Sequence, residues 1–159
     1  VNSYIYNNTI YCDSSIVAKI AIDNTSKGIL IVNNIFYFSG GSKAVIGDQY
    51  KPDKEGSELA KNVLFKNNLF LKPTGWPTEI KIKDMAPIYG NPHFTNAGSL
   101  DPKAYLPKNL NLVKGKGIEI NLLSNDSIGL LQCLKLKKDI LGNTISGNPS
   151  LGAIEPMRN

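Results

Sequence analysis

The stretch LIVNNIFY, at residues 30–37, places a pair of asparagines between two runs of apolar residues that favour β-strands. The same arrangement occurs as YIYNNTIY at residues 4–11 and as LFKNNLFL at residues 64–71. The pairs begin at positions 7, 33 and 67, so they are spaced by 33 − 7 = 26 and 67 − 33 = 34 residues. Each unit predicts strand, asparagine turn and strand, with no helical period. Repeats of this length are typical of a solenoid.

The asparagines themselves suit such a solenoid. Turns between short strands need residues near the left-handed region, which Asn tolerates better than most residues. Successive coils stack about 4.8 Å apart, so an inward Asn meets its counterpart one coil away, and its amide can donate to the next amide oxygen. The sequence therefore predicts that Asn8, Asn34 and Asn68 form a ladder along the solenoid axis. The alternative, three ordinary asparagine turns in a β-sandwich, does not account for the matching flanks.

Alternation of apolar and polar residues predicts further half-buried strands. In SIVAKIAID (15–23) and TEIKIKD (78–84), the residues expected on the buried side are Ile16, Ala18, Ile20 and Ile22, and then Ile80 and Ile82. The segment 39–61 is polar and rich in turn formers, which predicts an inserted loop. We expect one domain, with β-helix coils over 1–84 and an irregular exit and closing segment over 85–159.

Composition excludes some classes of function. The chain has 159 residues, 18 of them Asn, and a formal net charge of +5. Arg158 is the sole arginine and the lysines are scattered, which argues against nucleic acid as a partner and leaves an acidic polymer compatible. Cys12 and Cys133 lack CxxC spacing, so free thiols are expected and one disulfide is left open. No run approaches the roughly 20 apolar residues of a membrane helix.

Two later stretches add to the three repeats: GNPHFTNAGSLDPKAYLPKNLNLVKGKGIEI from residue 90 and DILGNTISGNPSLGAIEP from residue 139. Together they resemble the late coils and closing segment of a right-handed parallel β-helix of the pectate-lyase-like superfamily. The resemblance implies an all-β fold and a structural closing motif, in which Asp139 caps a turn; its positions are Asp139, Gly142, Gly152, Ala153 and Glu155. The chain departs from the pattern at residues 111–120, where Ser-Pro-Ala usually precedes the glycine pair.

The same resemblance implies the C-terminal part of a large bacterial carbohydrate-active protein that is secreted, periplasmic or on the cell surface. The parent would be a polysaccharide lyase or glycosidase that binds a polysaccharide, with an acidic one compatible. The alternative is a non-catalytic β-helix adhesin or carbohydrate-binding module, so enzyme activity is left open. Val1 opens the chain directly in strand-like sequence without a leader. We therefore expect an uncovered first coil that self-associates or is disordered.

Candidate catalytic groups do not form a recognisable set. Asp13, Asp23, Asp48 and Asp53 are isolated acids, whereas hydrolases of this fold need clustered carboxylates. The lysines at 66, 72, 81 and 83 suit solvated strand faces better than a lyase base, and the single His93 sits in a loop. No metal-ligand spacing appears, no cofactor is evident, and calcium stays compatible with the parent. Catalytic residues are therefore unassigned, and we expect the isolated chain to be inactive.

Two aromatics are candidates for contact with sugar rings. Trp76 lies in PTGWPTE, a loop bounded by turn formers, and Tyr50 lies in the predicted insertion. An aromatic on such a loop can stack on a sugar, and insertions on one face of a solenoid often carry a binding surface. The alternative for Trp76 is packing over the end of a strand, and for Tyr50 a surface loop without a ligand.

Overall fold

The computed structural model describes residues 2–23, 26–45, 60, 62–124, 126–127 and 135–157. Within these residues the fold is all-β, as predicted, with parallel strands in three sheets. The first sheet contains β1 (Ser3–Tyr6), β4 (Ile29–Val32) and β7 (Val63–Lys66). The second contains β2 (Thr9–Cys12), β5 (Ile35–Phe38), β8 (Leu69–Phe70) and β9 (Ile88–Tyr89), and the third contains β3 (Ala18–Ile20) and β6 (Ser42–Ala44). Short helical turns follow: η1 (Pro73–Gly75), η2 (Pro102–Tyr105) and α1 (Leu110–Val113).

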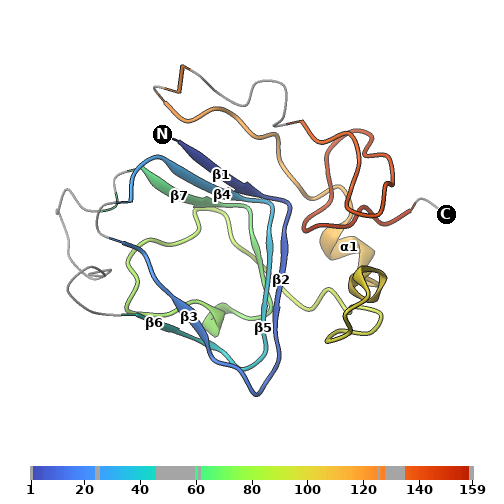
Figure 1. The fold of residues 1–159 in the computed structure, drawn as a ribbon, viewed down its shortest axis with the longest axis horizontal. Coiled ribbons are helices and arrows are strands. Elements are labelled where there is room, and N and C mark those ends of the chain that lie inside the picture. The colour runs from blue at the N-terminus through green and yellow to red at the C-terminus, as the bar shows by residue number, and fades with distance from the viewer. Residues whose placement is uncertain are drawn as a thin grey trace.

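From β1 to β8, consecutive strands lie in different sheets, and the strands of each sheet pair in parallel with those of the neighbouring circuit; β9 then adds to the second sheet beside β8. Figure 1 shows the three sheets as the sides of a triangle around a common interior. The register aligns equivalent positions of the asparagine repeats, because Ile5 pairs with Ile31 and Ile31 with Phe65. In the second sheet Ile10 pairs with Phe36 and Phe36 with Phe70. The repeat seen in the sequence is therefore the repeat of the stack.

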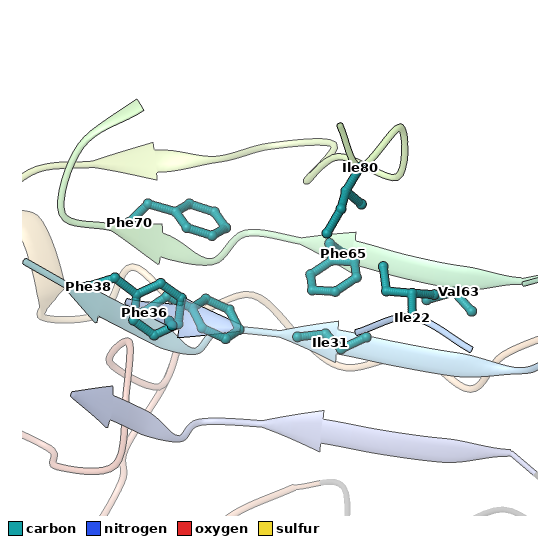
Figure 2. Close-up of a cluster of buried hydrophobic side chains, with 9 residues drawn as sticks. Ile22, Ile31, Phe36, Phe38, Val63, Phe65, Phe70 and Ile80 are labelled. Atoms are coloured by element: carbon teal, nitrogen blue, oxygen red, sulfur yellow. The ribbon is translucent and has the colours of Figure 1, made fainter. Parts of the chain in front are cut away.

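The interior is filled by side chains that alternate inward along the strands. Figure 2 shows Ile31, Phe65, Phe36 and Phe70 among this cluster. Phe36 and Phe70 stack one circuit apart, with ring centroids 5.4 Å apart and planes inclined by 12°. Burying an apolar side chain of this size contributes about 1.5–3 kcal/mol, so the matched flanks of the asparagine pairs also supply the core.

The strand predicted around Ile80 and Ile82 is absent from the described residues. After η1 the chain instead crosses the end of the interior, where Ile80 is fully buried against the same cluster beyond β7 (Figure 2). Only Asp84 bridges to Phe65 of β7. Apolar and polar residues alternate here because one face of this extended segment is buried over the end of the interior. The alternation does not reflect pairing with a neighbouring strand along the length of the segment.

Three predicted boundaries also need correction. Ser42–Ala44 form β6 and pair with β3, so the stretch 39–61 is not wholly an insertion; residues 46–59 lie outside the described residues. β9 joins the second sheet after position 84, the predicted end of the coils. Of the strand predicted over residues 15–23, only Ala18–Ile20 are paired, and Ile16 precedes them and is exposed.

The described residues after β9 lie outside the triangle, where they cover the outward faces of the first two sheets (Figure 1). On the second sheet, Val113 and Leu151 bury Ile35 and Leu69. On the first sheet, Leu123 packs against the outward residues Leu30 and Val32. Among the residues that the structure describes, no helix has the length and apolar character needed to cross a membrane.

Candidate functional site

The second asparagine of each pair forms a hydrogen-bonded column inside the stack. Nδ2 of Asn8 donates to Oδ1 of Asn34 (3.0 Å), and Nδ2 of Asn34 donates to Oδ1 of Asn68 (2.9 Å). Oδ1 of Asn34 also accepts the backbone N–H of Asn8, and Oδ1 of Asn68 accepts the backbone N–H of Asn34, each at 2.9 Å. Asn34 and Asn68 are fully buried, so the amides satisfy polar groups that water cannot reach. The asparagine stacking expected from the sequence is present.

Asp84 ends this column, a role that the sequence did not indicate. Its carboxylate accepts from Nδ2 of Asn68 (2.6 Å) and from the backbone N–H groups of Asn67 and Asn68 (3.0 Å each). The carboxylate thus takes the place that the asparagine of a further circuit would occupy. Nothing near Asp84 resembles an asparagine pair, and it follows Asn68 by a shorter interval than a circuit, so the repeat pattern gave no signal for it.

The first asparagine of each pair faces the closing segment. Asn7, Asn33 and Asn67 have φ values of 51°, 59° and 56°, the left-handed conformation that Asn tolerates. Nδ2 of Asn67 donates to the carbonyl of Lys116 (2.9 Å). Asn33 donates to the carbonyl of Ile118 (2.8 Å) and accepts its N–H (3.0 Å). These amides therefore hold the closing segment against the corner between the first and second sheets.

Asn7 makes a less complete set of bonds. Its Nδ2 donates to the carbonyl of Ser150 at 2.8 Å. Its Oδ1 is buried and has no hydrogen-bond partner among the described residues. Among the first asparagines of the pairs, Nδ2 of Asn67 donates to Oδ1 of Asn33 (2.9 Å). Nδ2 of Asn33 donates to the carbonyl of Ile118 and not to Asn7. Asn7 is therefore left with an unused acceptor, which is uncommon in a buried position.

The closing motif fastens the last residues through its two acids. Asp139 accepts from the backbone N–H groups of Leu141 (2.9 Å), Asn143 (2.8 Å) and Glu155 (2.8 Å), as a turn-capping residue does. Glu155 in turn accepts the N–H of Ser150 at 2.9 Å. Both carboxylates are thus occupied with backbone groups and hold the loop between them in shape.

The glycine and alanine of the motif touch the asparagine repeat directly. Gly152 has φ 79°, and a Cβ at this position would lie 2.6 Å from both Cδ1 of Ile35 and Oγ1 of Thr9. Its N–H donates to the carbonyl of Asn33 (2.8 Å), and the N–H of Ala153 donates to Oγ1 of Thr9 (3.1 Å). Only glycine allows this close approach. Gly142, at φ 84°, has open space around its Cβ position.

A cleft lies between the asparagine corner and the closing segment. Its larger part, about 610 Å³, is lined by Asn7, by residues from Ile118 to Leu122 and by residues around Ile145 and Asn148. An adjoining cavity of about 350 Å³ continues past Asn7 towards Asp139 and Glu155. The two cavities share Asn7, Leu136 and Ile145. We call these two adjoining cavities the closing cleft, and they form the candidate binding site of the chain.

The titratable groups with shifted pKa values are Tyr4 in β1 and the neighbouring Tyr11 and Asp13 at β2. Burial raises the pKa of the Tyr4 hydroxyl, which donates to Asp126 and accepts the N–H of Leu123. Burial also raises the pKa of Tyr11, and hydrogen bonds from Ser15 lower the pKa of Asp13. No group of three or more His, Cys, Asp or Glu side chains suited to a metal ion occurs among the residues that the structure places.

Trp76, the first of the two aromatic candidates, is partly buried over the end of the strands, and its contact with a sugar stays a prediction. Its ring packs edge-on against Phe65 (centroids 4.8 Å apart), Phe70 (5.9 Å) and Phe36 (6.3 Å). Its Nε1 donates to the carbonyl of Ile82 at 3.1 Å. The alternative considered for this residue, cover over the end of the strands, is the observed arrangement. Tyr50 lies outside the described residues.

The other candidates do not form a site with the closing cleft. The lysines at 66, 72, 81 and 83 are exposed, and Nζ of Lys83 donates to the carbonyl of Pro77 (3.0 Å). His93 is exposed in the exit loop with φ 52°. Cys12 is a free thiol, and Cys133 lies outside the described residues. None of the described residues among them lines the closing cleft. The sequence did not indicate this cleft because, apart from Tyr6 to Asn8, its walls come from segments without a repeat.

Comparison with known proteins gave no match to any family model and no match to a curated protein.

Proposed function

We propose that this chain is the closing part of a right-handed parallel β-helix in a longer secreted protein that processes polysaccharide, and that it provides scaffold and a surface for glycan contact. The observation that carries the proposal is the difference between the two ends of the stack. One end is closed by Ile80 and Asp84, which complete the apolar interior and the asparagine column. At the other end, the strands of the first circuit have no further circuit over them among the described residues.

At that other end, the inward side chains of the first circuit are uncovered. Ile5 is 44% exposed although its register partner Ile31 is 6% exposed, and Ile10 is 36% exposed although Phe36 is 7% exposed. The strands β1, β2 and β3 are edge strands of their sheets. Uncovered strand edges beside apolar side chains favour the addition of another strand. A preceding circuit of the same build would cover all of them.

The open end also supports the expectation that the isolated chain self-associates. Light scattering over a range of concentrations is expected to show association that weakens in the double variant Ile5→Lys/Ile10→Lys. The matched control is Lys19→Gln/Lys43→Gln, which changes exposed residues of the third sheet. A wild-type chain that stays monomeric at every concentration would count against an uncovered apolar end.

For the parent we propose a polysaccharide lyase or glycosidase whose catalytic groups lie on circuits before β1. The groups with shifted pKa values support this placement because Tyr4 lies in β1 of the first sheet, the neighbouring Tyr11 and Asp13 lie at β2 of the second sheet, and none of them lines the closing cleft. The rival proposal is a non-catalytic adhesin that uses the same surface. Upstream circuits with recurring Asp or basic positions would favour the enzyme, and near-identical repeats would favour the adhesin.

The test uses the isolated chain with pectate, alginate, glycosaminoglycans and xylan. Unsaturated products, reducing ends and retardation in gels containing each polymer are followed together. We expect no turnover, and retardation by the acidic polymers that fades as salt rises, because the chain carries a formal charge of +5. Turnover lost on substitution of one of the lysines at 66, 72, 81 or 83 would contradict the proposal, and so would the absence of any retardation.

A further inference from the structure

We propose that the closing cleft binds a short acidic saccharide, a uronate oligomer of a few rings. This inference rests on the proposed function and names the ligand class of its glycan-contact surface. Four features of the cleft carry it: its size and shape, its amide-rich lining, the unused acceptor of Asn7 and the lysines at its rim.

The dimensions suit a short linear ligand. The larger cavity, about 610 Å³, falls within the range of about 300–1,000 Å³ that is usual for small-molecule sites. The adjoining cavity of about 350 Å³ extends it along the closing motif. Because Asn7, Leu136 and Ile145 line both parts, the two cavities adjoin each other. A chain of sugar rings can occupy both parts, whereas a single small ion would leave most of their volume unfilled.

The lining favours hydroxyl groups over an apolar ligand. Ile118, Ile120 and Ile145 provide aliphatic surface, and the amides of Asn7, Asn121 and Asn148 are interspersed with it. An amide both donates and accepts hydrogen bonds, as a hydroxyl does. A lipid tail would leave these amides without partners, at a cost of about 1–3 kcal/mol for each one that is fully desolvated. Sugar rings present apolar faces and hydroxyl edges together.

The side-chain oxygen of Asn7 is a buried, unused acceptor in a residue that lines both cavities. It has no hydrogen-bond donor in the described structure, and its residue lies where the two cavities meet. In the next circuit the equivalent oxygen of Asn33 accepts the N–H of Ile118. A small shift of the Asn7 amide would bring its oxygen to a donor in the cleft. A sugar hydroxyl supplies that donor, which a carboxylate or ether oxygen cannot.

Charge at the rim selects an acidic sugar. Lys135 lines the larger cavity and Lys138 the smaller one, and both are exposed. Of the acids around the cleft, Asp139 and Glu155 are bonded to backbone N–H groups. Glu119 is the remaining carboxylate in the lining of the larger cavity. The two ammonium groups can each meet a uronate carboxylate, so recognition is expected to weaken with salt.

Calorimetric titration with trigalacturonate at low salt tests the inference, with its fully methyl-esterified counterpart as the neutral control ligand. We expect binding of the acid and much weaker binding of the ester. The double variant Lys135→Gln/Lys138→Gln is expected to weaken binding by about five- to tenfold, the size given by two exposed ion pairs. The matched double variant Lys19→Gln/Lys43→Gln, on the third sheet, is expected to bind like the wild type. Ile145→Trp, which narrows the point shared by both cavities, is expected to abolish binding.

Each other result overturns the inference in a recognisable way. Equal binding of the acid and the ester would show that the rim lysines do not recognise the carboxylates. Equal weakening of binding in Lys135→Gln/Lys138→Gln and in Lys19→Gln/Lys43→Gln would show the same. Wild-type affinity in Ile145→Trp, with an unchanged circular dichroism spectrum, would place the saccharide elsewhere. Failure to bind trigalacturonate while pectate still retards the chain would overturn the cleft and leave the proposed function standing. Loss of both would overturn the glycan contact itself.

Discussion

The two asparagines of each pair are adjacent in sequence and have different structural roles. The second one, as in Asn34, bonds to the same residue of the next circuit and stabilises the interior of the stack. The first one, as in Asn33, bonds mainly to the backbone of a segment 85 residues away and holds the outer cover. Asparagine thus contacts the equivalent residue of the next circuit on the inner side of the chain and the closing segment on the outer side. The two roles differ because adjacent residues at a turn point in different directions.

Replacement of Asn34 by Ala is expected to have the largest effect on stability. It leaves the backbone N–H of Asn8 without its acceptor, and removes the donors to Oδ1 of Asn68 and to the carbonyls of Val32 and Ile5. A buried group without its partner costs about 1–3 kcal/mol, so we expect the free energy of unfolding to fall by about 3 kcal/mol. Urea denaturation measures it. Asn8→Ala, at the exposed end of the same column, is the control and is expected to cost less.

Replacement of Asn33 by Ala is expected to cost about 2 kcal/mol, since it leaves the N–H and carbonyl of Ile118 unpaired and places Ala at φ 59°. Asn33→Gly separates the two causes, because Gly accepts this φ and lacks the amide. We expect the Gly variant to recover the backbone part alone. Equal stability of Asn33→Gly and wild type in urea would show that the amide bonds to the closing segment contribute nothing.

The glycine of the closing motif tests the same contact from the other side. In Gly152→Ala the new Cβ would meet Ile35 and Thr9 at 2.6 Å, with φ 79°. Crowding of this kind costs roughly 1–3 kcal/mol. Gly142→Ala shares the positive φ but has open space, so it isolates backbone strain from the clash. The close approach of the closing segment to β2 and β5 would be refuted by equal melting temperatures of the two variants.

A smaller effect is expected at high pH. Burial raises the pKa of Tyr4 above 10.0, with Asp126 contributing. The neutral hydroxyl therefore adds stability that is complete below the pKa of an unfolded tyrosine, about 10, and is lost as the pH rises through the folded value. Denaturation at a series of pH values between about 9 and 11 is expected to show a steeper loss in the wild type than in Tyr4→Phe. Parallel curves would show that the cover over β1 does not depend on this hydroxyl.

The inner asparagine column could be predicted from sequence because it repeats. Equivalent positions carry the same residue with the same flanks, and the strand spacing brings them together. The fold class follows from the same repeat. The outer column could not be predicted, because Lys116, Ile118 and Ser150 carry no repeat that would show which asparagine each of them meets.

The candidate site was missed for a related reason. The walls of the closing cleft come from Asn7, from residues 118–122 and from residues 145–149, which are brought together only by the folded closing segment. Trp76 was singled out by the sequence, but its position between two turn formers is compatible with two roles. It could stack on a sugar from an exposed loop or pack over the end of the strands. Its burial against Phe65 and Phe70 depends on how the chain crosses the end of the stack, which local sequence does not specify.

Native-state amide exchange, compared between Asn33→Ala and Asn34→Ala, tests the division between the two columns most directly. If the first asparagine holds the cover and the second the stack, Asn33→Ala will speed exchange in residues 110–123 and 139–157 and leave β4, β5 and β7 protected. Asn34→Ala will speed exchange in those strands. The same pattern of exchange in both variants, or faster exchange of β4 and β5 in Asn33→Ala alone, would contradict it.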